Sequence, residues 1–207
     1  MAAVLDVGVQ KGTGSLIEVY PDVPHLLFEP VKAFAPDIAR TYDYKRIKHQ
    51  LFEVALSDVD GSGLMEVRKT DGEEISHAWV SNRGESVRLA RLDTLVPQSG
   101  ASGPYLLKID VDGADAPGKI IDGAAGVMKD VSCVVCEMVV DRFFDLSARI
   151  QRHGFVLWDI VECSYYDDVF YQCDVLFLRR EQIESEKRLK PFGLSTFDPR
   201  KWWGSHD

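Results

Sequence analysis

The sequence predicts an α/β fold in which a mostly parallel sheet, closed by an antiparallel strand, carries helices on both faces. First, short apolar segments alternate with helix-like segments along the chain, which is typical of parallel strands joined by helices. Second, a glycine-rich turn follows the first apolar segment, within residues 4–14, where such sheets bind nucleotide-like cofactors. Third, two apolar segments at 155–162 and 174–180 are predicted to close the sheet as a pair.

The individual elements are predicted in the order in which the apolar segments occur. Strands are expected at residues 5–7, 25–29, 52–56, 64–68, 87–91, 105–111, 131–137, 155–162 and 174–180. Helices are expected at residues 14–20, 30–40 and 144–153. Pro30 ends the second strand because proline has no N–H group for the sheet, and Gly154 ends the last helix as glycine commonly does.

The middle of the chain reads differently from the rest. Residues 58–63 are rich in turn formers, so the strand at 64–68 can return antiparallel. Residues 87–91 alternate apolar and basic side chains, which is typical of an edge strand with one wet face. His77 and Trp79 fall between these strands in a polar stretch that we expect to be a loop.

Length and composition favour one soluble domain. We place it at residues 1–184 and expect a charged, aromatic tail at 185–207, which includes Trp202 and Trp203. The net charge of −9 argues against a partner held through its phosphates, so we expect no nucleic acid. No apolar run is long enough to span a membrane, and residues 4–7 already read as a strand, so we expect neither a membrane span nor a signal peptide.

Two of the four cysteines have the spacing of metal-binding and redox motifs. Cys133 and Cys136 nevertheless lie in the apolar run 131–136, where a cysteine behaves as a small apolar residue. We therefore expect buried thiols in a reduced, cytoplasmic protein.

The glycine turn by itself is compatible with two classes of cofactor. Gly8, Gly12 and Gly14 allow close approach of a ligand to backbone N–H groups, and their spacing also matches the loop of short-chain dehydrogenases. Those enzymes use a Tyr-x-x-x-Lys pair to move protons at a nicotinamide. Tyr44 and Lys48 have that spacing but precede the third predicted strand, so the dinucleotide interpretation is poor.

S-adenosylmethionine fits the acidic residues better. Glu29 follows the second strand, where a carboxylate can accept hydrogen bonds from the two ribose hydroxyls. Ser57 and Asp58 follow the third strand, where the adenine would be met, although Asp58 could equally cap a turn. The sequence therefore favours S-adenosylmethionine as the cofactor.

The chain resembles the FkbM family of methyltransferases in the order and spacing of several motifs. These are Leu5-Asp6-Val7-Gly8, Phe28-Glu29-Pro30, Val54-Ala55-Leu56-Ser57-Asp58 with Gly61, Arg91-Leu92-Asp93-Thr94-Leu95, Leu107 to Asp115, Gly123-Ala124, Glu137 and His153-Gly154-Phe155. The resemblance implies a Rossmann-like class I methyltransferase that uses S-adenosylmethionine on hydroxyl groups of sugars, lipids or other small molecules. The family usually has Asn at position 10 and Glu at 112 and 115, where this chain has Gln10, Asp112 and Asp115.

Two sets of site residues follow from these arguments. The expected cofactor-binding residues are Asp6, Gly8, Val9, Gln10, Gly12, Glu29, Pro30, Leu56, Ser57 and Asp110. The expected catalytic residues are Asp110, Glu137 and His77, because a hydroxyl acceptor needs a base. Asp110, Asp112 and Glu137 could also hold Mg²⁺ or Mn²⁺, but Asp112 and Asp115 could equally cap the following helix. We assign no chemistry to Lys108, which we expect to face away from the end of its strand.

Two other functions remain open at this point. One is an NAD(P)-dependent oxidoreductase, and the other is a binding module that keeps the methyltransferase fold without turnover. The expected partner is a small-molecule, glycan or lipid acceptor, and a homo-oligomer is compatible with the sequence.

Overall fold

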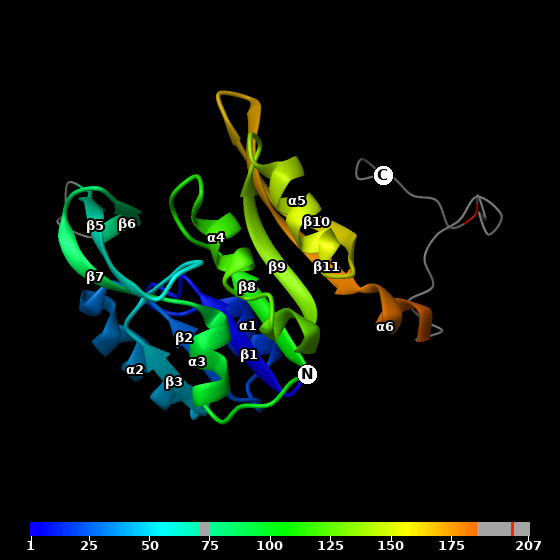
Figure 1. The fold of residues 1–207 in the computed structure, drawn as a ribbon, viewed down its shortest axis with the longest axis horizontal. Helices are drawn as coiled ribbons and strands as arrows, with labels where there is room; N and C mark the ends of the chain where they lie inside the picture. The colour runs from blue at the N-terminus through cyan, green and yellow to red at the C-terminus, as the bar shows by residue number, and fades with distance from the viewer. Residues whose placement is uncertain (71–74, 186–199, 201–207) are drawn as a thin grey trace.

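The computed structural model describes residues 1–70, 75–185 and 200 (Figure 1). A seven-stranded sheet with the strand order β10-β11-β9-β8-β1-β2-β3 forms the centre of the molecule. Its strands are β1 (Ala3–Val7), β2 (His25–Phe28), β3 (His49–Phe52), β8 (Tyr105–Ile109), β9 (Val131–Val139), β10 (Phe155–Tyr166) and β11 (Val169–Arg179). Strands β3, β2, β1, β8 and β9 run parallel, and β11 lies antiparallel between β9 and β10. The predicted fold class is confirmed.

Helices cover both faces of this sheet. On one face, α1 (Gly14–Val19) and α2 (Ala35–Lys45) pack through Ile17, Ile38 and Tyr42 against Leu27. On the other, α3 (Leu92–Gln98), α4 (Ala116–Asp122) and α5 (Phe143–Arg152) bury the larger core, and Figure 1 shows them along the near face. Short 3₁₀ turns at Lys32–Phe34 and Val127–Asp130 and the helix α6 (Arg180–Ser185) complete this layer structure.

A second sheet is inserted between β3 and α3. It contains β4 (Ala55–Leu56), β5 (Gly61–Lys69), β6 (Ile75–Ser81) and β7 (Glu85–Ala90), in the order β4-β7-β5-β6. The predicted single strand at 52–56 is therefore wrong: β3 ends at Phe52 and β4 belongs to the other sheet. Because β3 is an edge strand with half-buried side chains, residues 49–51 gave little apolar signal.

Two further expectations for the middle of the chain are wrong. The stretch around His77 and Trp79 is the strand β6 rather than a loop. The segment at 87–91 is not an edge strand, since β7 lies between β4 and β5. Both strands belong to a small sheet whose side chains are mostly exposed or half-buried, so their apolar periodicity is weak.

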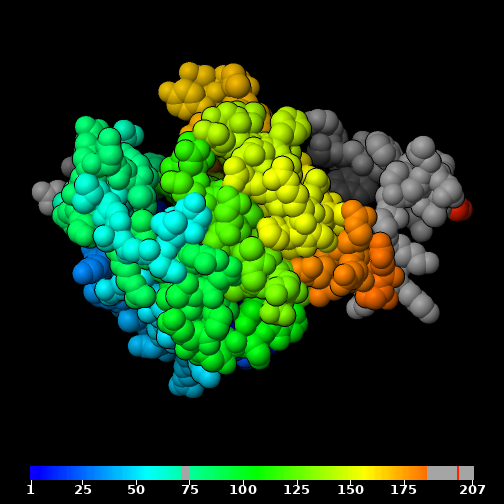
Figure 2. Space-filling model, viewed as in Figure 1, coloured from blue at the N-terminus to red at the C-terminus, as the bar shows by residue number. Residues whose placement is uncertain are grey.

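The closing hairpin is longer than predicted. β10 continues to Tyr166 and β11 begins at Val169, and the tip of this hairpin projects beyond the rest of the surface (Figure 2). Tyr165 and Tyr166 are 65% and 74% exposed, so this end of β10 has no buried face from which a strand could be predicted. The tail predicted at 185–207 begins at the last residue of α6, and its remaining residues, Arg200 excepted, lie outside the described part of the chain.

No helix among the described residues combines the length and the hydropathy that a membrane crossing requires.

Candidate functional site

The glycine turn passes directly over the end of β8. Gly8 has φ +84°, and its N–H donates to the carbonyl of Phe28 at 3.0 Å. A Cβ atom built at Gly8 would lie 1.7 Å from the carbonyl oxygen of Asp110, so only glycine fits this position. The close approach ties the ends of β1, β2 and β8 together and leaves bare backbone at the carboxyl edge of the sheet.

Glu29 connects the glycine turn to the end of β2. One carboxylate oxygen accepts from the N–H of Gln10 and the other from the N–H of Val31, both at 2.8 Å. The residue is only 4% exposed, and this burial raises the pKa of its carboxyl, while the two N–H groups oppose part of the rise. Gln10 has φ +49°, a conformation in which Asn is more common, and it is the backbone N–H of Gln10 that binds Glu29.

A cavity of about 350 Å³ opens beside this turn. The predicted site residues that line it are Gly8, Val9, Gln10, Gly12, Glu29, Pro30, Leu56, His77, Asp110 and Asp112. Asp6, Ser57 and Glu137 do not line it. The Ser57 hydroxyl instead donates to Asp58 at 3.0 Å, and its backbone N–H donates to the carbonyl of Ala90. The volume is in the range of small-molecule and cofactor sites.

The inserted sheet supplies one wall of the cavity. Residues 75–80 of β6 line it, together with Met65 of β5. The carboxylate of Asp112 accepts from the N–H of Ala78 at 2.9 Å and so fixes the free edge of β6 above the main sheet. Sequence reasoning missed this wall, to which Met65 and Ile75 contribute apolar side chains, because its strands carry too little apolar alternation to be recognised.

Lys108 does not behave as expected, because it lines the cavity and takes part in an ion pair. Its Nζ lies 2.5 Å from a carboxylate oxygen of Asp110, and its side chain is 9% exposed. Burial lowers the pKa of Lys108, but the hydrogen bond to Asp110 and the negative charges of Asp110, Asp6 and Asp174 together raise it above its ordinary value. The alternation of β8 signals this placement, since Lys108 and Asp110 fall on the same face of the strand.

Glu137 lies beside this ion pair and outside the cavity. It accepts a hydrogen bond at 2.6 Å from the side-chain amide of Gln172. Burial and then the negative charges of Asp110 and Asp174 raise the pKa of Glu137 to about 7. Such a carboxyl changes protonation near neutral pH, which suits a proton-transfer role.

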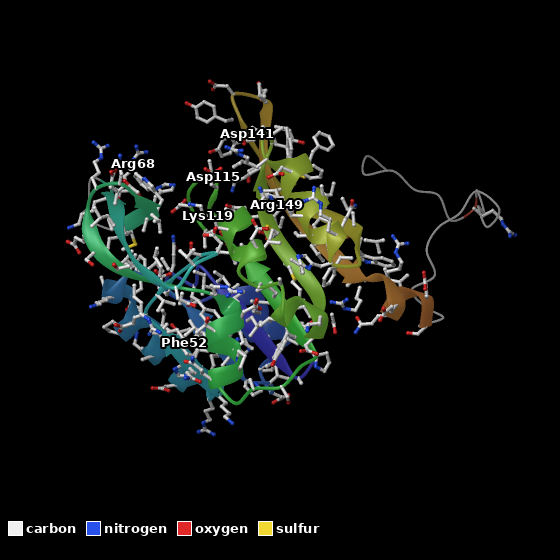
Figure 3. All side chains as sticks on the ribbon, in the orientation of Figure 1. Phe52, Arg68, Asp115, Lys119, Asp141 and Arg149 are labelled. Carbon is white, nitrogen blue, oxygen red and sulfur yellow. The ribbon has the colours of Figure 1, made fainter. Side chains whose placement is uncertain are left out.

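The predicted Mg²⁺ or Mn²⁺ site is not supported. Within residues 1–70, 75–185 and 200, no three His, Cys, Asp or Glu side chains are grouped so that they could hold a metal ion. Asp112 is engaged by the N–H of Ala78 and Glu137 by Gln172. Asp115 and Asp141 lie at the rim above α4 and β9, where Asp115 pairs with Arg142 at 3.4 Å (Figure 3).

The two cysteines of the CxxC segment lie on β9, where Cys136 is buried and Cys133 is half-buried. Both are free thiols, and burial raises the pKa of Cys133 to about 11. Cys136 is therefore buried as expected, whereas Cys133 is not fully buried.

Asp6 lies fully buried beneath the glycine turn, opposite Lys108 in the neighbouring strand. Within the described part of the chain neither of its carboxylate oxygens has a hydrogen-bond partner. The positive charge of Lys108 lowers the pKa of Asp6 in part, and the nearby side chains of Thr13 and Tyr42 contribute less. Burial dominates and raises the pKa of Asp6 to about 6.

This carboxyl makes the stability of the fold depend on pH. In the folded protein Asp6 keeps its proton up to about pH 6, whereas in the unfolded chain it loses it near pH 4. The folded state binds more protons in this window, so the free energy of unfolding is expected to fall as pH rises through it. Asp6→Asn should remove this fall and stabilise the protein at pH 7 by up to about 3 kcal/mol, measured by denaturant unfolding. Asp22→Asn, at an exposed residue, is the matched control, and parallel curves for wild type and Asp6→Asn would contradict the assignment.

The fold has counterparts among solved proteins. Precorrin-6y C5,15-methyltransferase from Geobacter metallireducens aligns with a TM-score of 0.50 and 9% identity, over 86% of this chain and 79% of that protein. The fibrillarin pre-rRNA processing protein of Methanococcus jannaschii aligns with a TM-score of 0.53 and 9% identity, over 86% of this chain and 66% of that protein. Streptococcus pneumoniae Sp1610 is proposed to be a tRNA (m1A22) methyltransferase and was solved with S-adenosyl-L-methionine. It aligns with a TM-score of 0.51 and 16% identity, over 86% of this chain and 66% of that protein.

These likenesses define the class of fold. The chain has the Rossmann-like fold of class I methyltransferases, and it spans about two thirds of the length of the fibrillarin and Sp1610 proteins. No family model matches the sequence, and no curated protein matches it either.

Proposed function

We propose that this chain is an S-adenosylmethionine-dependent methyltransferase that methylates a hydroxyl group of a small molecule, sugar or lipid. The observation that carries the proposal is the position of the Glu29 carboxylate, which lines the cavity beside the turn at Gly8. A carboxylate offers about four lone-pair sites, of which the N–H groups of Gln10 and Val31 occupy two. The other two are available to the ribose diol of the cofactor.

The rest of the cavity fits the remaining parts of this cofactor. The methionine part would lie along the turn at residues 8–12, where the absence of side chains at Gly8 and Gly12 lets a ligand approach the backbone closely. The adenine would lie against the apolar side chains of Val31, Phe34 and Leu56. The reactive methyl group would then point toward Asp110 at the end of β8.

The reaction is an in-line displacement. The acceptor oxygen would form a bond to the methyl carbon while the carbon–sulfur bond breaks. The electron pair of the broken bond would stay on sulfur and give S-adenosylhomocysteine. The acceptor proton must pass to a base. Asp110 and His77 line the cavity and are candidates for direct contact, and Glu137 beside Asp110 is a candidate to hold the proton near neutral pH. No step is assigned to a metal ion.

The alternative oxidoreductase function has less support. Tyr44 is 83% exposed on α2, and Lys48 borders a separate cavity with Pro24 and His25 at the amino edge of the sheet, opposite the glycine turn. The resemblance of the sequence motifs to the FkbM family supports the proposal that the chain is a member of that family and that it methylates hydroxyl groups. The net charge of −9 argues against nucleic acid as the acceptor, although two of the fold neighbours have names that refer to RNA.

Calorimetric titration with S-adenosylhomocysteine and, separately, with NAD tests the cofactor class. We expect binding of the former in the micromolar range and none of the latter at millimolar concentration; the reverse would refute the proposal. A screen with methyl-labelled cofactor against sugars, lipids and tRNA then tests turnover. Transfer to a hydroxyl of a sugar or lipid supports the proposed acceptor class, transfer to tRNA would overturn it, and binding without any transfer would favour the non-catalytic module.

A further inference from the structure

The pairing of β10 with β11 contains a bulge that brings two cysteines together. The regular pairs on either side of the bulge are Val161 with Asp174 and Ser164 with Gln172. Between these pairs, Glu162 and Cys163 of β10 lie opposite the single residue Cys173 of β11. Two residues opposite one define a β-bulge. The bulge therefore places Cys163 across from Cys173, although the whole hairpin tip separates them in the sequence.

Glu162 takes up the extra residue of this bulge. Its φ is +51°, in the left-handed region that is unfavourable for a residue with a side chain and that glycine usually occupies in such bulges. A strained backbone that persists in a fold indicates a constraint at that position. Here the strained residue directly precedes Cys163 and allows it to lie opposite Cys173.

Both cysteine side chains lie on the same face of the hairpin. Ser164 is paired with Gln172, so these two side chains share one face. Side chains alternate along a strand, so Cys163, which precedes Ser164, lies on the other face. Cys173 follows Gln172 and lies on that other face as well. Opposed residues have Cβ atoms about 4.5–5.5 Å apart and a disulfide needs about 3.5–4.5 Å, so a shift of about 1 Å suffices.

The two thiols differ in their access to solvent. Cys163 is exposed, whereas Cys173 is 1% exposed, and both are free in the structure. Burial raises the pKa of the Cys173 thiol, and the charge of Cys163 adds to the rise, in agreement with their position opposite each other. A dissolved oxidant therefore reaches Cys163 first, and Cys173 is the neighbouring thiol that can react with the oxidised sulfur.

The two cysteines of β9 are not placed to compete with Cys173. Cys136 is paired with Val175, so it lies diagonally from Cys173. Diagonal neighbours are about 7–8 Å apart, which exceeds the Cα separation of most disulfides. Cys133 is paired with Leu178, whose side chain lies on the opposite face of β11 from Cys173. Of the four cysteines, Cys173 is thus the one that lies opposite Cys163.

We propose that Cys163 and Cys173 form an oxidisable dithiol, which a hydroperoxide closes into a disulfide across the bulge. The Cys163 thiolate attacks a peroxide oxygen, the O–O bond breaks, and the second oxygen takes up a proton and leaves as an alcohol or as water. The sulfur of Cys173 then displaces the oxygen of the Cys163 sulfenic acid, which takes up the thiol proton and leaves as water. Two thiols are oxidised and one hydroperoxide is reduced. The inference concerns the hairpin and holds whether or not the proposed methyltransferase function is correct.

Peroxide oxidation of the full chain, followed by peptide mapping, tests the pair. The reduced chain is treated with hydrogen peroxide, the remaining thiols are blocked under denaturing conditions at acidic pH, and the chain is digested without reductant. Trypsin leaves both cysteines in the peptide 153–179, because no Lys or Arg lies between Arg152 and Arg179. An aspartate-specific protease then cuts at Asp167 and Asp168, between the cysteines. We expect the two halves to stay joined, at a rate that does not depend on protein concentration.

Variants identify the thiols that react. Cys163→Ser should abolish the joined product and leave Cys173 reduced. Cys133→Ser, at a cysteine outside the pair, is the matched control and should leave the product unchanged. Resistance of the buried Cys136 to alkylation before denaturation reports that each protein is folded.

Three outcomes would overturn the proposal. One is a disulfide that joins Cys173 to Cys136 instead. Another is a dimer linked through two Cys163 residues. The third is a Cys163 that is unreacted, or oxidised beyond the sulfenic acid, next to a Cys173 whose thiol is still free.

Discussion

Alanine in place of Gly8 is expected to destabilise the fold by about 4 kcal/mol or more, which places it among the largest effects of a single substitution. The added Cβ would lie 1.7 Å from the carbonyl oxygen of Asp110, and the φ of +84° is unfavourable for any residue with a side chain. Neither the turn nor β8 can move away easily, because Gly8 and Asp110 are held by backbone hydrogen bonds to Phe28 and Val7. Denaturant unfolding measures the loss directly.

Gly14 provides the matched control for this prediction. It starts α1, has no atom within 4 Å of the position of an added Cβ, and does not need a positive φ. Gly14→Ala should therefore stay within about 1 kcal/mol of the wild type. A Gly8→Ala protein that unfolds at the wild-type denaturant concentration would show that the turn does not pack on β8 as described.

Glu29→Gln is expected to weaken S-adenosylhomocysteine binding by about 3 kcal/mol, on the order of 100-fold in Kd. The amide keeps one acceptor oxygen but turns an N–H₂ group toward one of the two backbone N–H groups that Glu29 now accepts. It also offers one oxygen instead of two to the ribose diol. Calorimetric titration at a temperature where both proteins are folded measures the change.

Glu53→Gln separates this effect from a general change in charge. Glu53 is an exposed residue directly after β3 and does not line the cavity. Its substitution should leave Kd unchanged. If Glu29→Gln bound S-adenosylhomocysteine as tightly as the wild type, Glu29 would not contact the ribose, and the role proposed for it would have to be abandoned.

Local sequence patterns predicted the main sheet except for its edge strand β3. The alternation of apolar and helical segments predicted most of the parallel strands, since largely apolar runs such as 105–109 occur where a strand is buried on both faces. The positions of Gly8 and Glu29 at strand ends also predicted that both would border one cavity, because the carboxyl ends of parallel strands meet at the same edge. Weak alternation hid the inserted sheet, whose side chains are mostly exposed or half-buried.

The contacts between distant side chains could not be predicted in this way. Asp110, Asp112 and Glu137 were predicted to lie at one edge of the sheet, where they could have held a metal ion or, in the case of Asp112, capped a helix. In the structure Asp110 pairs with Lys108, Asp112 holds β6 through Ala78, and Glu137 binds Gln172. Each partner other than Lys108 comes from a segment more than 30 residues away, so only strand register and the position of the inserted sheet bring them together.

The sequence by itself therefore determined the class of fold, the glycine turn and the carboxylate at the end of β2. These features depend on local periodicity and on single residues whose backbone conformation or position after a strand is distinctive. The tertiary structure alone decided that β6 forms a wall of the cavity and that Lys108 pairs with Asp110. The physical reason is that burial patterns are encoded locally, whereas the partner of a buried charge or of an apolar face is set by chain segments that meet only after folding.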